Sequence, residues 1–118
     1  MRILLIDDDA ELAAEMAEAL EGERYQVDIA GDPDDARRLL AGGRYDLLLL
    51  DYKLPRYDGI ELLKRMLGHQ DIPPVILISG SLNLTDLVNE AGLQDIVKTV
   101  VGKPFTINEL ITAVSCFP

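Results

Sequence analysis

The stretch that decides the fold is Leu47-Leu48-Leu49-Leu50-Asp51, four consecutive leucines that end at one aspartate. Such a run is apolar on both faces and lacks the alternation of a half-exposed strand, so it is typical of a strand buried in a parallel sheet. A helix is expected next, because Asp58-Gly59 opens a segment with apolar residues at helical spacing: Ile60, Leu63, Met66 and Leu67. The centre of the chain therefore predicts a parallel sheet covered by helices.

Four other segments have the pattern of strands. In chain order they are Arg2–Ile6, Tyr25–Ala30, Val75–Ile78 and Thr99–Val101. Arg2–Ile6 and Val75–Ile78 are continuous apolar runs, as expected of buried strands. Strands that alternate with helices along the chain imply right-handed crossovers and a parallel sheet. We therefore expect an α/β fold, in which a (βα)5 doubly wound sheet of five parallel strands carries helices on both faces.

Local signals place the other helices. The first helix has apolar or small residues at helical spacing before a stop at Gly22, namely Leu12, Ala13, Met16 and Leu20. Asp32-Pro33 is an N-cap followed by proline at the first helical position, and it leads to Leu39-Leu40. The last helix starts at the capping box Thr106–Glu109 and is expected to bury Ile107, Leu110, Ile111 and Val114.

The stretch from Leu82 to Lys98 carries two helical phases. The first phase comprises Leu84, Leu87, Val88 and Ala91, and the second comprises Leu93, Ile96 and Val97. Glycine adopts backbone conformations that end helices, so Gly92 is expected to break the helix between the two phases.

The bulk composition narrows the function. A chain of 118 residues fits one domain, and its apolar runs are too short to span a membrane. A net charge of −10 repels polyanions, so direct binding of nucleic acid is not expected. The single cysteine, Cys116, cannot form an internal disulfide, and Met1 leads directly into a strand without room for an export signal. The expected location is the cytoplasm.

Polar side chains follow the apolar runs at one edge of the expected sheet. Asp7 and Asp8 end the first strand, Asp51 ends the third, Ser79 ends the fourth and Lys103 follows the fifth. In open parallel sheets ligands bind beyond the carboxyl ends of the strands, so these side chains are expected to share one site. An acid after the first strand can instead do no more than cap the following helix. We expect this role for Asp9, the residue after Asp8.

This set of residues suits phosphoryl transfer. Three carboxylates close together repel one another unless a cation is present, and an all-oxygen site with room for water suits Mg²⁺. The cation neutralises charge on the phosphoryl oxygens, while Lys103 pairs with another oxygen and Ser79 donates a hydrogen bond to a third. Asp51 is left as the nucleophile, because a carboxylate can form an acyl phosphate.

The pattern resembles the receiver domains of two-component response regulators, in the superfamily of the chemotaxis regulators. The resemblance covers the whole chain and rests on Ile6–Asp9, Leu50–Pro55 continuing to Asp58-Gly59, Ile78–Gly80 and Lys103–Phe105. It implies one receiver domain over residues 1–118, a flavodoxin-like strand order 2-1-3-4-5, and phosphorylation of Asp51 by a histidine kinase or phosphotransfer protein. Such a domain is a signalling phosphoacceptor rather than an enzyme, and it catalyses only its own phosphorylation and dephosphorylation.

The resemblance also implies finer roles. Asp8 is expected to bind Mg²⁺ directly, Asp7 partly through water, and Lys53 through its backbone carbonyl beside Asp51. The Lys103-Pro104 peptide bond is expected to be cis, although only about 5–6% of X-Pro bonds in folded proteins are. The expected protein partners are a downstream target, an output domain, or a second copy bound through the surface of the fourth helix, fifth strand and fifth helix.

One position departs from the family pattern. Receiver domains carry an aromatic residue three positions before the lysine, and its rotation accompanies movement of the hydroxyl toward the phosphate. Here that position is Val100, and no aromatic lies between Gln94 and Lys103. The phosphorylation chemistry is therefore expected to be intact, while the transmission of the signal is expected to differ.

Three alternatives share parts of this pattern. Haloacid dehalogenases also use an aspartate nucleophile, but they place a second acid two residues later, where this chain has Lys53. A flavodoxin-like flavin carrier needs a phosphate-binding loop after the first strand, and the aspartates there would repel the phosphate. A degenerate receiver that acts only as a phosphorylation-independent docking module is the more serious alternative, although the acids that it would lack are present.

Overall fold

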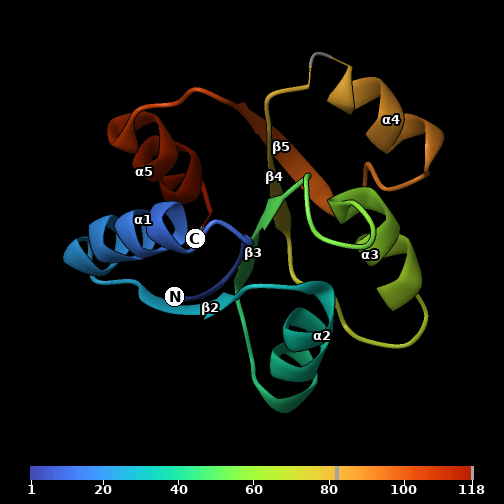
Figure 1. Ribbon diagram of the computed structural model, residues 1–118, viewed down its shortest axis with the longest axis horizontal. Coiled ribbons are helices and arrows are strands. Elements are labelled where there is room, and N and C mark those ends of the chain that lie inside the picture. Colours follow the sequence, from blue (N-terminus) through green and yellow to red (C-terminus); the bar gives the residue numbers. More distant parts are fainter. Residues whose placement is uncertain (82, 118) are drawn as a thin grey trace.

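The structure, a computed structural model, describes residues 1–81 and 83–117 and forms one parallel sheet between two layers of helices (Figure 1). Leu82, where the stretch with two helical phases begins, and Pro118 lie outside the described residues. The elements in chain order are β1 Arg2–Ile6, α1 Ala10–Gly22, β2 Gln26–Ala30, α2 Pro33–Gly42, β3 Leu47–Asp51, α3 Gly59–Met66, β4 Val75–Ser79, α4 Leu84–Glu90, β5 Val97–Gly102 and α5 Ile107–Ser115.

The strand order is β2-β1-β3-β4-β5 and all neighbouring pairs are parallel, so the expected sheet is confirmed. The leucine run occupies the centre of this sheet, and every residue of β3 is buried. Because side chains alternate across a strand, Leu48 and Leu50 pack against α2, α3 and α4, while Leu47 and Leu49 pack against α1 and α5. The continuous apolar run is thus explained by helices on both faces.

The helix starts follow the expected caps. Asp9 Oδ1 accepts from the Leu12 amide at 3.1 Å, Asp32 Oδ1 from the Asp35 amide at 2.9 Å, and Asp58 Oδ1 from the Glu61 amide at 2.9 Å. Thr106 forms the expected capping box with Glu109. The cap assigned to Asp9 is therefore confirmed, which separates this residue from the two aspartates before it.

The chain departs from expectation at several places, and in α5 both Ile107 and Ile111 are affected, since Ile111 is only half-buried. Ile107 was expected to be buried but is 39% exposed, because Leu110 and Val114, four residues apart, take the line that faces the sheet and leave the first residue of α5 at the edge. Leu67 lies beyond the end of α3 and is exposed. The fifth strand begins at Val97 rather than Thr99, since a β-bulge allows Val97 to pair with Val75 before the regular register resumes.

Gly92 ends the fourth helix as expected. It follows Ala91, the C-cap residue of α4, with a φ of +73°, a left-handed conformation that glycine adopts without strain. Among the residues described, no helix combines the length and apolar character needed to cross a membrane.

Candidate phosphoacceptor and metal site

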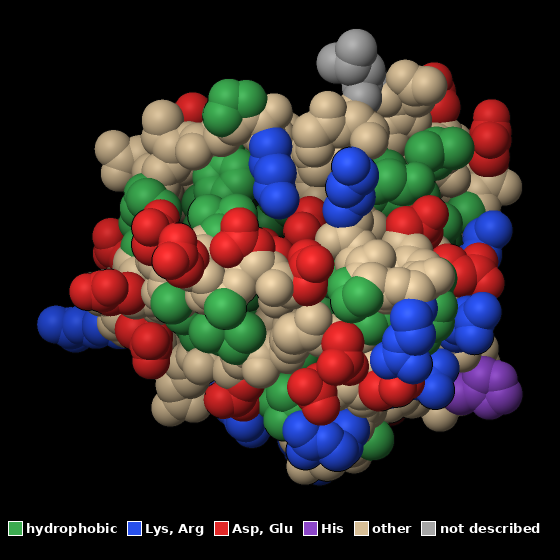
Figure 2. Space-filling view, in the orientation of Figure 1, with side chains coloured by type: hydrophobic (Ala, Val, Ile, Leu, Met, Phe, Trp, Pro, Cys, Tyr) green, Lys and Arg blue, Asp and Glu red, His purple; other side chains and the backbone are tan. Residues whose placement is uncertain are grey.

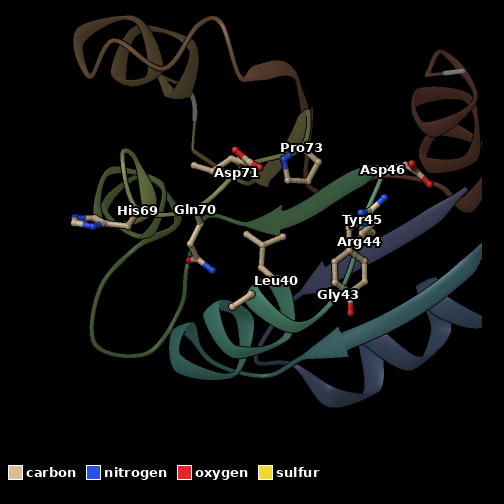
Figure 3. A pocket seen from close by; sticks show the side chains of 11 residues that line it. Leu40, Gly43, Arg44, Tyr45, Asp46, His69, Gln70, Asp71 and Pro73 are labelled. Carbon is tan, nitrogen blue, oxygen red and sulfur yellow. The ribbon is translucent and has the colours of Figure 1, made fainter.

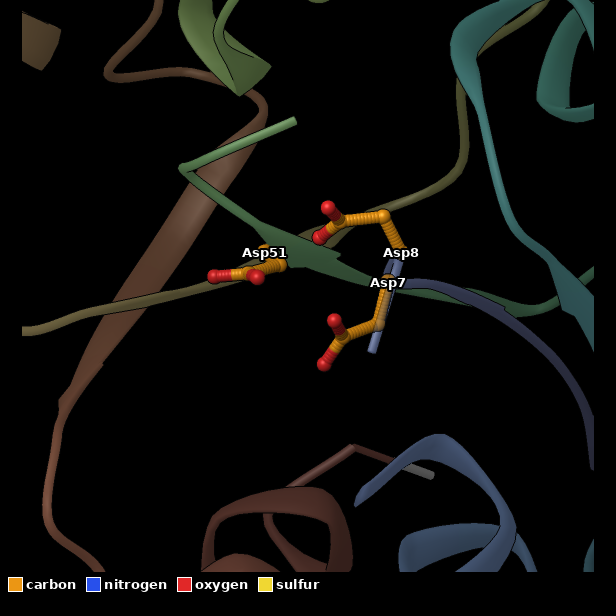
Figure 4. A group of neighbouring side chains, drawn as sticks. All are labelled: Asp7, Asp8 and Asp51. Atoms are coloured by element: carbon orange, nitrogen blue, oxygen red, sulfur yellow. The ribbon is translucent and has the colours of Figure 1, made fainter. Parts of the chain in front are cut away.

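The strand ends bring three carboxylates together. β1 and β3 are neighbours with Ile6 opposite Leu50, so Asp7 and Asp8 leave the sheet beside Asp51. Figure 4 shows the three side chains in one group, and a carboxylate oxygen from each lies within 4.8 Å of the other two. The structure therefore brings together three of the residues that the sequence analysis placed at this edge of the sheet.

Asp7 is the most constrained of the three acids. It is 1% exposed, its Oδ1 accepts from the Asp9 amide at 2.9 Å, and its Oδ2 is buried with no hydrogen-bond partner among the described residues. Burial, with a further contribution from the negative charge of Asp51, raises the pKa of Asp7 to about 6. A buried carboxylate oxygen without a donor fits a site that holds a cation.

Lys103 supplies the positive charge of the site. Its Nζ lies 3.3 Å from Asp51 Oδ1, and Asp51 itself is only 5% exposed. The backbone amide of Lys103 donates to the Ser79 carbonyl at 2.8 Å, which fixes the end of β5 against β4. The Lys103–Pro104 peptide bond is cis, so this prediction is confirmed.

Ser79 lies on the side of Asp51 away from Asp7. It is 4% exposed, and its Oγ accepts from the Ser81 amide at 2.8 Å, which leaves the hydroxyl proton free to be donated. Ser79, Lys103 and Asp51 line one hollow of about 340 Å³ together with Lys53, Gly80 and Ser81. All of the predicted site residues therefore border the same region, with Asp7 and Asp8 at one side and this hollow at the other.

Two contributors were not identified from the sequence. The Ser81 amide orients the Ser79 hydroxyl, and Gly59 allows α3 to start against the strand that carries Asp51. A Cβ atom at Gly59 would lie 3.0 Å from the Asp51 carbonyl oxygen and 3.1 Å from Leu50 Cγ, while the Gly59 amide donates to the Tyr52 carbonyl at 2.7 Å. The sequence signal was the Asp58-Gly59 pair, which we interpreted as a helix start and as part of the family pattern, but not as a packing position.

The donor set suits a hard divalent cation. Carboxylate oxygens from Asp7, Asp8 and Asp51 converge, and Asp7 Oδ2 is buried with no hydrogen-bond donor among the described residues. Oxygen ligands of this kind favour Mg²⁺ or similar ions over metals that prefer nitrogen or sulfur. The acidic cluster is therefore a fitting divalent cation site.

Comparison with known proteins gives one consistent result. Residues 3–115 match the family model described as the response regulator receiver domain. The transcriptional regulatory protein DltR of Streptococcus agalactiae is 33% identical over 114 residues, which are 97% of this chain and 50% of that protein. The response regulator MprA of Mycobacterium tuberculosis is 32% identical over 111 residues, 94% of this chain and 47% of that protein. The chain spans about half the length of these curated relatives.

Solved structures agree with this comparison. The receiver domain of the Francisella response regulator 1452 is 31% identical with a TM-score of 0.84, and the match covers 98% of this chain and 93% of that one. The response regulator TrrA of Thermotoga maritima, solved in complex with Mg²⁺ and BeF, is 28% identical with a TM-score of 0.81, over 98% of this chain and 96% of that one.

Proposed function

Since this chain belongs to the response regulator receiver domain family, and is a receiver domain of two-component signal transduction, we propose that Asp51 is its phosphoacceptor. The observation that carries the proposal is the convergence of Asp7, Asp8 and Asp51, with Lys103 Nζ 3.3 Å from Asp51. We assign all 118 residues to this one domain. A purely docking role is not favoured, because the residues of the reaction are present and gathered.

The proposed ligands of Mg²⁺ are Asp8 and Asp51 directly, Asp7 partly through water, and the backbone carbonyl of Lys53. The cation supplies charge neutralisation at the phosphoryl oxygens. The unpartnered Oδ2 of Asp7 supports this assignment, since a nearby cation or its bound water would satisfy that oxygen.

The chain's own residues position the reacting group. An oxygen of Asp51 attacks the phosphorus of the donor, the bond from phosphorus to the donor breaks, and the donor leaves with its electron pair. Lys103 and the hydroxyl of Ser79 then contact two of the phosphoryl oxygens, with charge-assisted hydrogen bonds of about 1.5–3 kcal/mol each. No general base is needed, because Asp51 reacts as a carboxylate.

The proposed donor is a histidine kinase or a phosphotransfer protein in the cytoplasm. The only chemistry proposed for the domain is its own phosphorylation and dephosphorylation. The signal would pass to a downstream protein, an output domain or a second copy, through the surface of α4, β5 and α5. Direct binding of nucleic acid or a membrane is not part of the proposal, since the chain carries a net charge of −10.

Intact mass spectrometry after incubation with acetyl phosphate and Mg²⁺ tests the proposal. We expect the protein to gain the mass of one phosphoryl group, and we expect EDTA to prevent the gain. Asp51→Asn should remain unmodified, whereas Asp46→Asn, an acid at the opposite end of the same strand, should react like the parent. An Asp51→Asn protein that gains the same mass at the same rate would refute the assignment.

A further inference from the structure

The cationic side chains of this acidic protein are concentrated on one side. The net charge is −10, and α1 carries Glu11, Glu15, Glu18 and Glu21 without a lysine or arginine. Figure 2 shows several Lys and Arg side chains near the single histidine, over α2 and α3, with acidic side chains among them, and acidic side chains gathered over α1. The cations near the histidine lie on other elements than the residues of the phosphoacceptor site.

A groove runs between α2 and α3 on the cationic side. It is a hollow of about 910 Å³, and its walls hold Arg37 and Arg38 from α2 and Lys64 and Arg65 from α3. These are four of the 11 lysines and arginines of the chain, and Asp34 is the single acid in the lining. The groove therefore presents cations from two facing helices.

A second hollow extends this groove. It has a volume of about 720 Å³, shares Ala41, His69 and Gln70 with the first, and continues past the start of β3, where its lining holds Arg44 together with Asp46 and Asp71. Figure 3 shows Gln70 reaching toward α2 from the segment after α3, with His69 directed outward. The two hollows adjoin at these shared residues, and the cations are concentrated in the first, so the first hollow is the part that suits an anionic segment.

The groove is preformed. Gln70 Nε2 donates to the Arg37 carbonyl at 3.1 Å, which ties the segment after α3 to α2. On the opposite wall the Arg65 guanidinium lies over the Tyr57 ring, 4.2 Å from its centroid. A partner would pay little ordering entropy here, because these contacts exist without it.

The cations of the groove are available to a partner. Arg37 and Lys64 have no carboxylate within 4.0 Å among the residues that the structure describes. Arg38 and Arg65 pair with Asp35 at 3.3 Å and Glu61 at 3.4 Å within their own helices, but both pairs are largely exposed. Exposed pairs of this kind contribute little, so these arginines can exchange partners readily.

We propose that the groove between α2 and α3 binds an acidic segment of a partner protein, with its carboxylates paired to Arg37 and Lys64 on the two walls. A helical segment with acids at positions i and i+4 would place one line of carboxylates along the groove. The groove lies on other elements than α4, β5 and α5, the surface proposed to transmit the signal. A partner bound in the groove would therefore leave that surface accessible.

The charge distribution favours a short acidic segment over other anions. A nucleic acid or an anionic membrane extends beyond the groove and meets the field of a chain with net charge −10. The Debye length is about 8 Å at physiological ionic strength. The carboxylates of a short segment in the groove would lie within that distance of the groove cations, whereas salt would largely screen their repulsion by the more distant acids of the chain. A second copy would dock its α1 into this groove, a head-to-tail contact that does not close on itself.

Fluorescence anisotropy tests the proposal with a labelled peptide of about 20 residues, built from alanine with glutamates at i and i+4, and a peptide with glutamine in their place. The measurements use the full chain in EDTA without a phosphodonor, so their outcome does not depend on chemistry at Asp51. The test variant is Arg37→Glu with Lys64→Glu. The matched control is Arg24→Glu with Lys98→Glu, which changes the net charge equally but lies outside the groove.

We expect the glutamate peptide to bind the parent with a dissociation constant below about 1 mM. The dissociation constant should rise about tenfold in the test variant and less than about twofold in the control variant. Should the charge reversal impair folding, Arg37→Gln with Lys64→Gln should still weaken binding about threefold. Equal weakening in test and control variants, or equal binding of both peptides, would overturn the proposal. So would tighter binding of an oligonucleotide or anionic vesicles, or self-association that the test variant abolishes.

Discussion

At the scale of single residues, Asp7 shows the sharpest conflict between charge and position. Its pKa is raised from 3.8 to about 6, mainly because burial disfavours the charged form. The folded protein therefore binds a proton at Asp7 that the unfolded chain releases between about pH 4 and pH 6, and stability from this group falls as the pH rises through that window. With the pKa of Asp7 raised from 3.8 to about 6, the free energy of unfolding at neutral pH is lower by about 3 kcal/mol than it would be with an unshifted carboxyl.

Replacing the charge should stabilise the metal-free protein. In EDTA at pH 8, we expect Asp7→Asn to raise the free energy of unfolding by about 1–3 kcal/mol, since asparagine retains a polar group but no charge. At pH 5 the gain should be about half as large, because Asp7 is already partly protonated. Urea titrations at the two pH values measure both quantities. Asp71→Asn, at an exposed acid, is the control, and an Asp7→Asn protein less stable than the parent at pH 8 would contradict the prediction.

Gly59 tests the contact between α3 and the phosphoacceptor strand. Gly59→Ala places a Cβ 3.0 Å from the Asp51 carbonyl oxygen, and we expect it to lower the free energy of unfolding by about 1–3 kcal/mol. Gly22→Ala is the matched control, because no atom lies within 4 Å of the added Cβ there and alanine favours the helix. Thermal unfolding of both variants provides the comparison. A Gly59→Ala protein as stable as Gly22→Ala would show that α3 shifts without cost.

Residues with chemical roles were easier to predict than residues with steric ones. Asp51 and Lys103 were recognised because each interrupts or follows an apolar run with a charge that a core would exclude. Gly59 was missed as a packing position because its constraint comes from Leu50 and Asp51 across the fold, which no local pattern encodes. The Ser81 amide was missed because backbone donors leave no signature in the sequence.

At the scale of elements, the predictions held where capping and periodicity agreed. The helix starts at Asp32 and Thr106 carry both signals and are confirmed. The start of β5 was misplaced because Val97 fits the second helical phase equally well, and its pairing with Val75 depends on a bulge that forms only in the sheet. Tertiary pairing decided this boundary, and local propensity did not.

Val100 in β5 leads to a prediction about signal transmission. Val100 is partly buried against the core beneath α3 and α4, and a β-branched aliphatic side chain cannot swing as a ring does. On adding beryllofluoride and Mg²⁺, amide chemical shifts should change strongly around Asp51, Ser79 and Lys103, and less across Ile107–Val114 in α5. Phosphate contacts provide part of the roughly 5.5 kcal/mol needed for near-complete conversion, but aromatic repacking is absent.

A substitution makes this prediction stricter. Val100→Tyr should enlarge the changes across α5, whereas Val101→Tyr, which faces the other layer of the core, should not. Large shifts throughout α5 in the parent protein would show that another element carries the signal. An absence of shifts around Asp51 would remove the phosphoacceptor assignment.

At the scale of the whole molecule, topology brings together residues that are distant in sequence. Asp51 and Lys103 are 52 positions apart, yet the order β2-β1-β3-β4-β5 places the ends of their strands on one edge of the sheet. The sequence predicted this edge because parallel strands share their direction. It did not predict the cationic groove, because Arg37 and Lys64 lie on separate helices whose facing sides are set only by packing.

The concentration of negative charge predicts that Mg²⁺ stabilises the protein in two separable ways. Any salt screens the repulsion within a chain of net charge −10, so NaCl should raise the unfolding temperature modestly. Mg²⁺ bound at Asp7, Asp8 and Asp51 adds a specific contribution, and at about ten times its dissociation constant this is about 1.4 kcal/mol, or about 5 °C for a domain of this size.

Thermal scans in MgCl₂ and in NaCl of equal ionic strength separate the two contributions. We expect the parent and Glu18→Gln, which removes an exposed charge on α1, to gain more from MgCl₂ than from NaCl. Asp8→Asn should gain equally from both salts, because it retains the general screening but loses a carboxylate of the cluster. Calorimetric titration should then show Mg²⁺ binding weakened in Asp8→Asn alone. If Asp8→Asn keeps the full Mg²⁺-specific gain, Asp8 is not a direct ligand of the cation.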